Sequence, residues 1–309
     1  MGACGRPDRL SPAHPKESQL SRSATGRSPR RTAAIRFAVP AGQLAALAAQ
    51  PPPDAPGRAP ALLVPGYTGS KEDFLSLLPL LAAGGHRTVA IDQRGQYESP
   101  GPDSLAAYGV QALATDLLHA LDVVGAPGVH VVGHSFGGLV ARAAVIRRPE
   151  RFASLTLLCS GPAAISGLRA QRIRTLEPLL RRGGLAGVLP AMELEWRAAR
   201  QAGTPSAVVE FLRTRFLTSS AAGLEGMGTA LLTEPDRVAE LAATGVPVLV
   251  AYGEDDDAWP PAVQAQMAAR LGAPVEVIAG AAHSPAAEAP AVIAAALLRF
   301  FSAVGDGHR

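Results

Sequence analysis

Residues 129–138 read VHVVGHSFGG, an apolar run that leads through a glycine-flanked serine into a stretch suited to a helix. The pattern predicts a buried strand over 129–132, a sharp turn at Ser135 and a helix over 136–148. The Gly-x-Ser-x-Gly spacing lets strand and helix approach closely, so the serine hydroxyl stands at the carboxyl end of the strand. Because a helix N-terminus directs its N–H groups at bound negative charge, Ser135 is a candidate nucleophile.

The segment around Ser135 strongly resembles the nucleophile elbow of the α/β-hydrolases. A structural serine in a glycine turn would need no acid, base or oxyanion donor elsewhere, and this chain offers candidates for all three. The resemblance implies a triad in the order Ser, Asp, His. A serine at the elbow argues against dehalogenase or epoxide hydrolase chemistry, for which the family uses a carboxylate nucleophile.

A candidate triad acid follows the apolar run over 246–252, which suits a buried parallel strand and ends at Gly253. The next four residues, 254–257, are all acidic. In the family that this run resembles, the acid lies three residues past the glycine, which is Asp256 here. Asp257 is the alternative acid. A solvated turn or a Ca²⁺ site are the other interpretations, although the ligand spacing and the glycine of a calcium loop are missing.

The candidate base is His283, which follows a short predicted strand over 274–279 and precedes the last predicted helix. The chain has seven histidines, and a single histidine is more often structural than catalytic. The chain order Ser135, Asp256, His283 matches the family, with the base in a loop before the last helix. His134, inside the elbow, is expected to pack beside the turn.

The candidate oxyanion hole lies after the predicted strand over 61–64. Residues 65–74 resemble the family's loop after its third strand, with Pro65 where a histidine is common. The resemblance implies two backbone donors, the N–H of Tyr67 and the N–H of Phe136, which directly follows the nucleophile. Because both donors are backbone groups, we expect the chemistry to survive the change at Pro65.

A further resemblance covers residues 91–99, which read IDQRGQYES and are close to the family's D-x-R-G-x-G-x-S segment after its fourth strand. Tyr97 stands where the second glycine usually lies. The fit is therefore good but imperfect.

Strand and helix patterns alternate along the chain, which predicts an α/β fold with a mostly parallel central sheet and helices on both faces. Strands are predicted at about 33–39, 43–49, 60–64, 87–91, 129–132, 154–159, 246–252 and 274–278. Helices are predicted at about 74–83, 105–124, 136–148, 261–271 and 286–302. The α/β-hydrolase core is expected over 33–162 and 234–303.

Between the two core segments the strand pattern stops and apolar residues recur at helical spacing, which predicts an all-helical insertion over 163–233. An insertion after the sixth strand resembles the family's helical cap, which implies a roof over the active site. The breakers of the insertion are expected to divide it into short helices: Pro178, Gly183, Gly184, Pro190 and Pro205. Four large side chains are candidates for the pocket wall or, more simply, for packing inside the cap: Met192, Trp196, Phe211 and Met227.

The basic character of the chain, with a pI of about 9.2, lies at its N-terminus. Residues 1–36 carry a net charge of +6 and the remainder −3. Because residues 1–32 are rich in Ser, Pro and Arg, we expect a disordered tail there, and a flexible C-terminus over 304–309. No nucleic-acid partner is predicted, and a binding arm for nucleic acid or protein is the alternative interpretation of the tail.

No apolar run approaches the length of a membrane span, so no membrane partner is predicted. The two cysteines, Cys4 and Cys159, imply no disulfide framework, which fits a cytoplasmic protein. The glycines near Ser135 lack a phosphate-loop lysine, and the mechanism needs neither metal nor organic cofactor.

These features together predict a serine hydrolase that cleaves a carboxylic ester-type bond of a small, apolar substrate through an acyl-enzyme. The same fold and triad also serve carbon–carbon bond hydrolases, cofactor-free perhydrolases or haloperoxidases, and ligand receptors with little turnover. The sequence indicates neither the natural substrate nor the oligomeric state.

Overall fold

The computed structural model describes residues 32–40 and 42–305. The tail predicted over 1–32 therefore lies outside the described residues except for Thr32, and so do residues 306–309 of the predicted flexible C-terminus.

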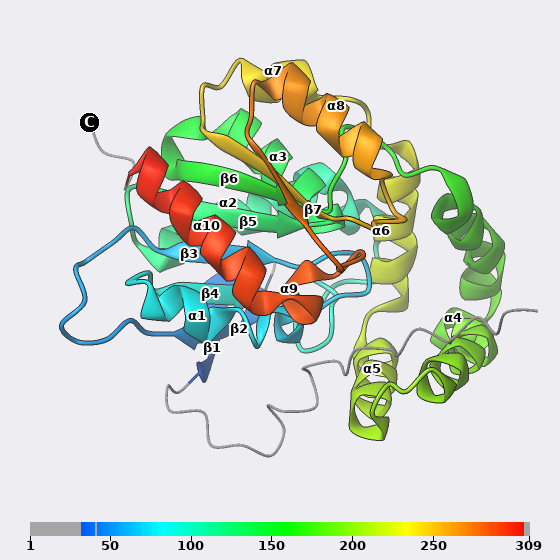
Figure 1. Ribbon diagram of the computed structural model, residues 1–309. Coiled ribbons are helices and arrows are strands. Elements are labelled where there is room, and N and C mark those ends of the chain that lie inside the picture. Colours follow the sequence, from blue (N-terminus) through cyan, green and yellow to red (C-terminus); the bar gives the residue numbers. More distant parts are fainter. Residues whose placement is uncertain (1–31, 41, 306–309) are drawn as a thin grey trace, which may run out of the picture.

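The core of the protein is an eight-stranded sheet with the order β1-β2-β4-β3-β5-β6-β7-β8 (Figure 1). The first two strands form an antiparallel hairpin, β2 pairs antiparallel with β4, and all other pairs are parallel. The strands are β1 (Thr32–Val39), β2 (Gly42–Ala49), β3 (Ala61–Val64), β4 (Thr88–Ile91), β5 (Val129–His134), β6 (Phe152–Leu158), β7 (Val248–Gly253) and β8 (Val275–Ile278). The predicted α/β fold is confirmed.

Helices cover both faces of this sheet. The helices are α1 (Leu78–Ala83), α2 (Val110–Val124), α3 (Phe136–Arg147), α4 (Gly167–Gln201), α5 (Ser206–Thr218), α6 (Ala221–Thr233), α7 (Val238–Ala242), α8 (Pro261–Leu271), α9 (Pro285–Glu288) and α10 (Pro290–Val304), with the 3-10 turns η2 (Lys71–Phe74), η3 (Leu105–Tyr108) and η4 (Pro149–Arg151). Helices α1 and α10 pack together on one face, and α2, α3, α7 and α8 lie on the other (Figure 1). Every residue of β3, β4, β5 and β6 is buried, as expected for parallel strands between two helical layers.

Helices α4, α5 and α6, which we call the helical insertion, follow β6 and lie beyond one end of the sheet (Figure 1). The breaks predicted at Pro178 and Pro190 were wrong, since helical structure continues through both prolines, whereas the break predicted at Gly184 is present as a kink that joins two helices within α4. Its one break is Gly184, at φ 56° and ψ −151°, a conformation that glycine alone adopts readily. Packing of α4 against α5 and α6 offsets the hydrogen bonds that the prolines remove.

The insertion has a small apolar cluster of its own, formed by Leu180, Val188, Trp196, Val209, Phe216 and Leu224. Of the four side chains considered for the pocket wall, Met192 lines the pocket described below. Trp196 is buried in the insertion cluster, and Met227 belongs to the main core. Phe211 instead makes an edge contact with Tyr97, with ring centroids 5.8 Å apart.

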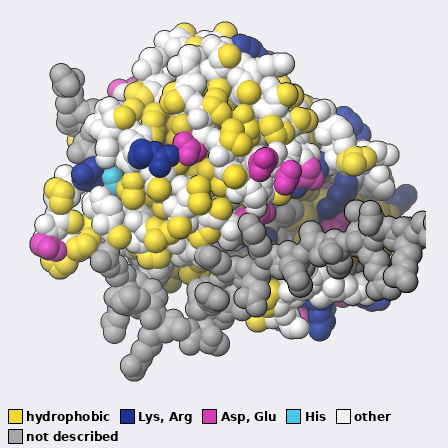
Figure 2. Space-filling model, in the orientation of Figure 1, with side chains coloured by type: hydrophobic (Ala, Val, Ile, Leu, Met, Phe, Trp, Pro, Cys, Tyr) yellow, Lys and Arg dark blue, Asp and Glu magenta, His cyan; other side chains and the backbone are white. Residues whose placement is uncertain are grey.

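Within the described residues, no helix combines the length and the apolar character that a membrane crossing requires. Figure 2 shows basic and acidic side chains interspersed among hydrophobic ones on the face that carries α10. Exposed apolar side chains include Val275 and Val277 of the edge strand β8 and Val292 of α10.

Candidate active site

Ser135 forms the turn between β5 and α3, and its backbone is held in a conformation that is rare for a residue with a side chain. Its φ is 53° and its ψ is −119°, and its N–H donates to the Leu158 carbonyl at 2.8 Å. A Cβ at Gly133 would lie 2.6 Å from the Gly137 carbonyl oxygen, so strand and helix approach as closely as the glycines allow. The surrounding contacts fix this strained turn, which holds the hydroxyl at the carboxyl end of β5.

The structure brings Ser135, His283 and Asp256 together in one hydrogen-bonded chain. The Nε2 atom of His283 lies 3.0 Å from Ser135 Oγ, and its Nδ1 atom lies 2.8 Å from Asp256 Oδ1. The three residues follow the carboxyl ends of β5, β8 and β7, which meet at one edge of the sheet because these strands are parallel. Such an array lets an imidazole take a proton from the hydroxyl while a carboxylate orients the ring.

The carboxylate of Asp256 is held in its ionised form. Oδ1 also accepts from the Ala258 N–H at 2.9 Å, and Oδ2 accepts from Gln264 Nε2 at 2.7 Å. Burial by itself raises the pKa of Asp256, but the hydrogen bond and charge of His283, together with the other two donors, outweigh burial and lower this pKa below its ordinary value. The carboxylate therefore stays available to the imidazole at neutral pH.

Asp257, the alternative acid, bonds to Arg169, whereas the His283 Nδ1 atom lies against Asp256. Asp257 accepts two hydrogen bonds from the Arg169 guanidinium of α4, at 3.0 and 2.6 Å. These bonds lower the pKa of Asp257. Asp257 thus joins the loop of the triad acid to the helical insertion.

Within the described residues, one group of three His, Cys, Asp or Glu side chains is close enough to share a metal ion, namely His134, Cys159 and His283, and it contains no member of the acidic run. That grouping is poorly suited to a metal ion. Both ring nitrogens of His283 are engaged by Asp256 and Ser135, and His134 Nε2 lies 2.7 Å from the His283 carbonyl oxygen. Burial raises the pKa of the Cys159 thiol, which opposes the thiolate that a metal would need.

The two predicted oxyanion donors belong to the residue after Ser135 and to a loop that lines the same pocket. Phe136 is the first residue of α3, where a helix leaves its N–H groups without intrahelical acceptors. Tyr67 lines the same pocket as Ser135, and within the described residues its backbone N–H has no acceptor. The preceding Gly66 is so close to the nucleophile that a Cβ there would lie 3.4 Å from Ser135 Oγ. Both N–H groups therefore remain candidates for oxyanion donors.

His134 connects the elbow to the loop of the base, a contact that sequence reasoning missed. The ring donates from Nε2 to the His283 carbonyl oxygen, because a carbonyl can only accept. Burial, followed by the charge of His283, lowers the pKa of His134 to about 4. His134 is therefore neutral at neutral pH and places no positive charge beside the His283 imidazole.

The low pKa of His134 makes stability depend on pH. In the unfolded chain this histidine is protonated below its ordinary pKa of 6.5. In the folded protein it is protonated only when the pH falls below about 4. The unfolded state therefore binds more protons in this window, and the free energy of unfolding falls as pH is lowered from 6.5 to 4. The shift corresponds to about 3 kcal/mol.

The measurement compares urea unfolding of the wild type and His134→Gln from pH 7 to pH 4. The amide of glutamine does not titrate, so the difference in unfolding free energy between the two proteins should change across the window. Parallel curves for the two proteins would contradict the assignment.

The triad opens into a cavity of about 890 Å³ beneath the helical insertion. Its wall away from the triad is largely apolar and includes Ile165, Ile173, Leu176, Leu180, Val188, Met192, Val208, Leu212, Phe216, Leu224 and Leu231. Three arginines line it as well, and each is paired with a carboxylate: Arg169 with Asp257, Arg172 with Glu195, and Arg215 with Asp73.

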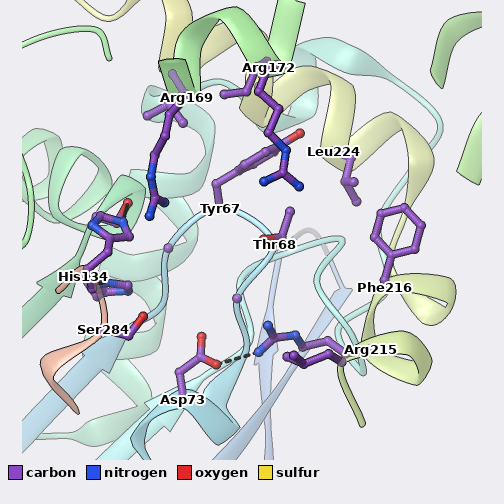
Figure 3. A pocket seen from close by; sticks show the side chains of 18 of the residues that line it. Tyr67, Thr68, Asp73, His134, Arg169, Arg172, Arg215, Phe216, Leu224 and Ser284 are labelled. Carbon is purple, nitrogen blue, oxygen red and sulfur yellow. Dashed lines mark hydrogen bonds and ion pairs between the residues drawn. The ribbon is translucent and has the colours of Figure 1, made fainter. Parts of the chain in front are cut away.

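The arginines lie on different parts of the cavity wall. Figure 3 shows Arg169 reaching from α4 toward His134, Arg172 extending over Tyr67, and Arg215 donating to Asp73. Three further carboxylates line the cavity, Glu177, Glu225 and Glu288, so its apolar body has a border that carries charges of both signs.

Two further contacts at the site carry no sequence signal. Gln264 of α8 donates to Asp256, and Arg169 of α4 holds Asp257. Each of these residues lies on a helix, whereas the carboxylate it contacts lies in the loop after β7. No sequence motif marks the glutamine or the arginine at its position. They could be recognised only once the fold had brought them together.

Comparison with known proteins agrees with this architecture. A model of the alpha/beta hydrolase family matches residues 61–296. The chain is 30% identical over 256 residues to rhodomycin D methylesterase DauP of Streptomyces sp. (strain C5), an alignment that covers 74% of this chain and 86% of that protein.

Solved structures are similar in fold. A thermophilic esterase from Thermogutta terrifontis has a TM-score of 0.70 and 23% identity, covering 89% of this chain and 99% of that one. The enol-lactonase from Burkholderia xenovorans LB400 has a TM-score of 0.71 and 20% identity, with 87% and 100% covered. With most of its length matched by the family model, the chain belongs to the alpha/beta hydrolase family and is a hydrolytic enzyme.

Proposed function

We propose that this enzyme is a serine hydrolase that cleaves a carboxylic ester through an acyl-enzyme on Ser135. The observation that carries the proposal is the hydrogen-bonded chain from Ser135 Oγ through His283 to Asp256, open to an apolar cavity. A methylesterase among the relatives supports an ester as the substrate class.

In the proposed mechanism, His283 Nε2 takes the proton of Ser135 as Oγ bonds to the ester carbonyl carbon. The N–H groups of Tyr67 and Phe136 hold the oxyanion, and Asp256 stabilises the imidazolium. His283 then gives its proton to the leaving alkoxide oxygen, and the C–O bond breaks. Water, deprotonated by His283, attacks the acyl-enzyme and releases the carboxylic acid with Ser135 restored.

The helical insertion acts, in this proposal, as a cap that selects the substrate. Its helices supply most of the apolar wall, and a cavity of about 890 Å³ has the size of sites that bind drug-sized ligands. We infer an apolar substrate body larger than a short-chain acyl group. Burial of that body beneath the insertion excludes water and strengthens the electrostatic interactions at the oxyanion.

The test is rapid-quench hydrolysis of p-nitrophenyl esters of increasing acyl size, with mass spectrometry of the quenched enzyme. The expected result is an acyl mass on the peptide that contains Ser135, and a kcat/KM that rises with the apolar size of the acyl group. Absence of both turnover and adduct with every ester would overturn the proposal.

The same panel separates the other activities of this fold. Thioesters and lactones test the breadth of acyl transfer, a diketone tests carbon–carbon cleavage, and hydrogen peroxide in place of water tests perhydrolysis. If one of these substrates is turned over and the esters are not, the proposed ester hydrolysis would be replaced by the activity on that substrate. A saturable ligand with no turnover in any arm would indicate a receptor.

A further inference from the structure

Two buried glutamines contact the loop that carries the Tyr67 donor. Gln93 and Gln96 follow β4, which lies beside β3 in the sheet, so the loops after these two strands pack together. Gln93 Nε2 donates to the Pro65 carbonyl oxygen at 2.9 Å, and Gln96 Nε2 donates to the Gly66 carbonyl oxygen at 2.7 Å. Both glutamines are 3% exposed, so their amide donors depend on these carbonyl groups and not on solvent.

The orientation of the Gln96 amide follows from its second hydrogen bond. Its Oε1 atom accepts from the backbone N–H of Gln93 at 3.0 Å. An N–H can only donate, so the oxygen of the amide must face Gln93 and the NH₂ group must face Gly66. The side chain thus presents a donor, in a fixed direction, to one carbonyl of the loop.

The two loops are also joined by charge. Lys71, at the start of η2, donates from its backbone N–H to Asp92 Oδ1 at 2.7 Å and from Nζ to Oδ2 at 2.8 Å. Both side chains are buried, and the lysine also pairs with Glu98 at 2.8 Å. The loop after β4 is therefore a firm support for the loop after β3.

The Gly66 carbonyl and the Tyr67 N–H belong to the same trans peptide, in which the two groups point in opposite directions. The carbonyl oxygen accepts from Gln96 and also from the Gly69 N–H at 3.1 Å. Holding the oxygen on that side directs the Tyr67 N–H to the other side. A rotated peptide would aim its oxygen there and leave the buried Gln96 donor unsatisfied, which disfavours the rotated peptide.

We propose that Gln96 is a positioning residue for the oxyanion hole, which keeps the Tyr67 N–H directed at the oxyanion by holding the Gly66 carbonyl. This inference rests on the proposed acyl-enzyme function. Gln93 has a supporting role, because its N–H orients the Gln96 amide and its own amide holds the preceding carbonyl. Neither glutamine touches the substrate cavity.

The experiment replaces Gln96 by glutamate and, separately, by methionine. Gln96→Glu keeps the shape but can put a carboxylate oxygen against the Gly66 carbonyl, which disfavours the active peptide orientation. We expect kcat for a p-nitrophenyl ester to fall about 10²- to 10³-fold, the scale of a lost oxyanion donor, with KM changed less than about threefold. Gln96→Met removes the hydrogen bond without adding repulsion, and we expect a smaller loss of about tenfold or more.

A boronic acid that forms a tetrahedral adduct with Ser135 gives a second readout. Its affinity should fall in parallel with kcat, because the adduct uses the oxyanion hole and the ground-state substrate does not. The control is Ser99→Ala, which removes a buried hydroxyl in the same loop that bonds to Ala45 and Asp92 but not to Gly66. This variant should keep kcat and boronate affinity even where it lowers the melting temperature.

The outcomes separate this inference from the proposed function. A wild type that turns over esters, with folded Gln96 variants equal to it in kcat and boronate affinity, would overturn the inference alone. A kcat that falls only as far in the Gln96 variants as in Ser99→Ala would also overturn it. A wild type that neither hydrolyses esters nor binds the boronate at Ser135 would overturn both proposals.

Discussion

Replacement of Ser135 by alanine is expected to lower kcat/KM for ester hydrolysis by about 10⁴- to 10⁶-fold. The hydroxyl is the only group on the elbow that can form the acyl-enzyme, and its hydrogen bond to His283 Nε2 has no replacement in alanine. The variant should fold, because the side chain is small and its backbone N–H still donates to Leu158. Steady-state kinetics on a p-nitrophenyl ester measures the loss.

A fluorophosphonate probe provides the matched observation. It should label the wild type at Ser135 and leave Ser135→Ala unlabelled, with far-UV circular dichroism of the two proteins superimposable. Labelling or ester turnover that persists at the wild-type level in the folded variant would require a different nucleophile.

Replacement of Asp256 by asparagine is expected to lower kcat by about 10³- to 10⁴-fold. The amide keeps the size of the carboxylate but loses its charge, and it favours the imidazole tautomer that cannot accept a proton from Ser135. The hydrogen bonds from Ala258 and Gln264 that lower the pKa of Asp256 would also meet an uncharged group. Comparison of kcat at neutral pH measures the effect.

The neighbouring carboxylate offers the matched control. Asp257→Asn makes the same chemical change one residue away, where the side chain is largely exposed and bonded to Arg169. Because an exposed ion pair contributes little, the loss in kcat should stay below about tenfold. A large loss in Asp257→Asn beside an active Asp256→Asn would assign the triad acid to Asp257.

The amino-acid sequence determined the parts of this site that depend on local rules. The spacing around Ser135 predicted a tight strand-turn-helix passage, because glycines are needed where strand and helix touch. Apolar runs ending at Val64, Gly253 and Ile278 predicted parallel strands, and their loops had to meet at one edge of the sheet. Family spacing then favoured His283 as the base and Asp256 as the acid, with Asp257 left open, and the structure places Asp256 and His283 within hydrogen-bond distance of each other.

Local rules failed where packing decides the conformation. Tyr97 takes a φ of 40° at a position where the resemblance implies glycine, and Lys71 Nζ lies 4.6 Å from the centre of its ring. Tertiary contacts offset the strain of that backbone. The prolines of α4 are a second case, since contacts with neighbouring helices keep the helix intact around Pro178 and Pro190.

Only the tertiary structure distinguished groups of the same chemical type. Asp256 and Asp257 are identical and adjacent, and which one meets His283 depends on the turn after β7 and on Arg169, 88 residues from Asp257. The contact of Gln96 with Gly66 likewise requires β4 to lie beside β3. Such partners are determined by distance and direction in space. Residue type and separation along the chain do not specify which two side chains will meet.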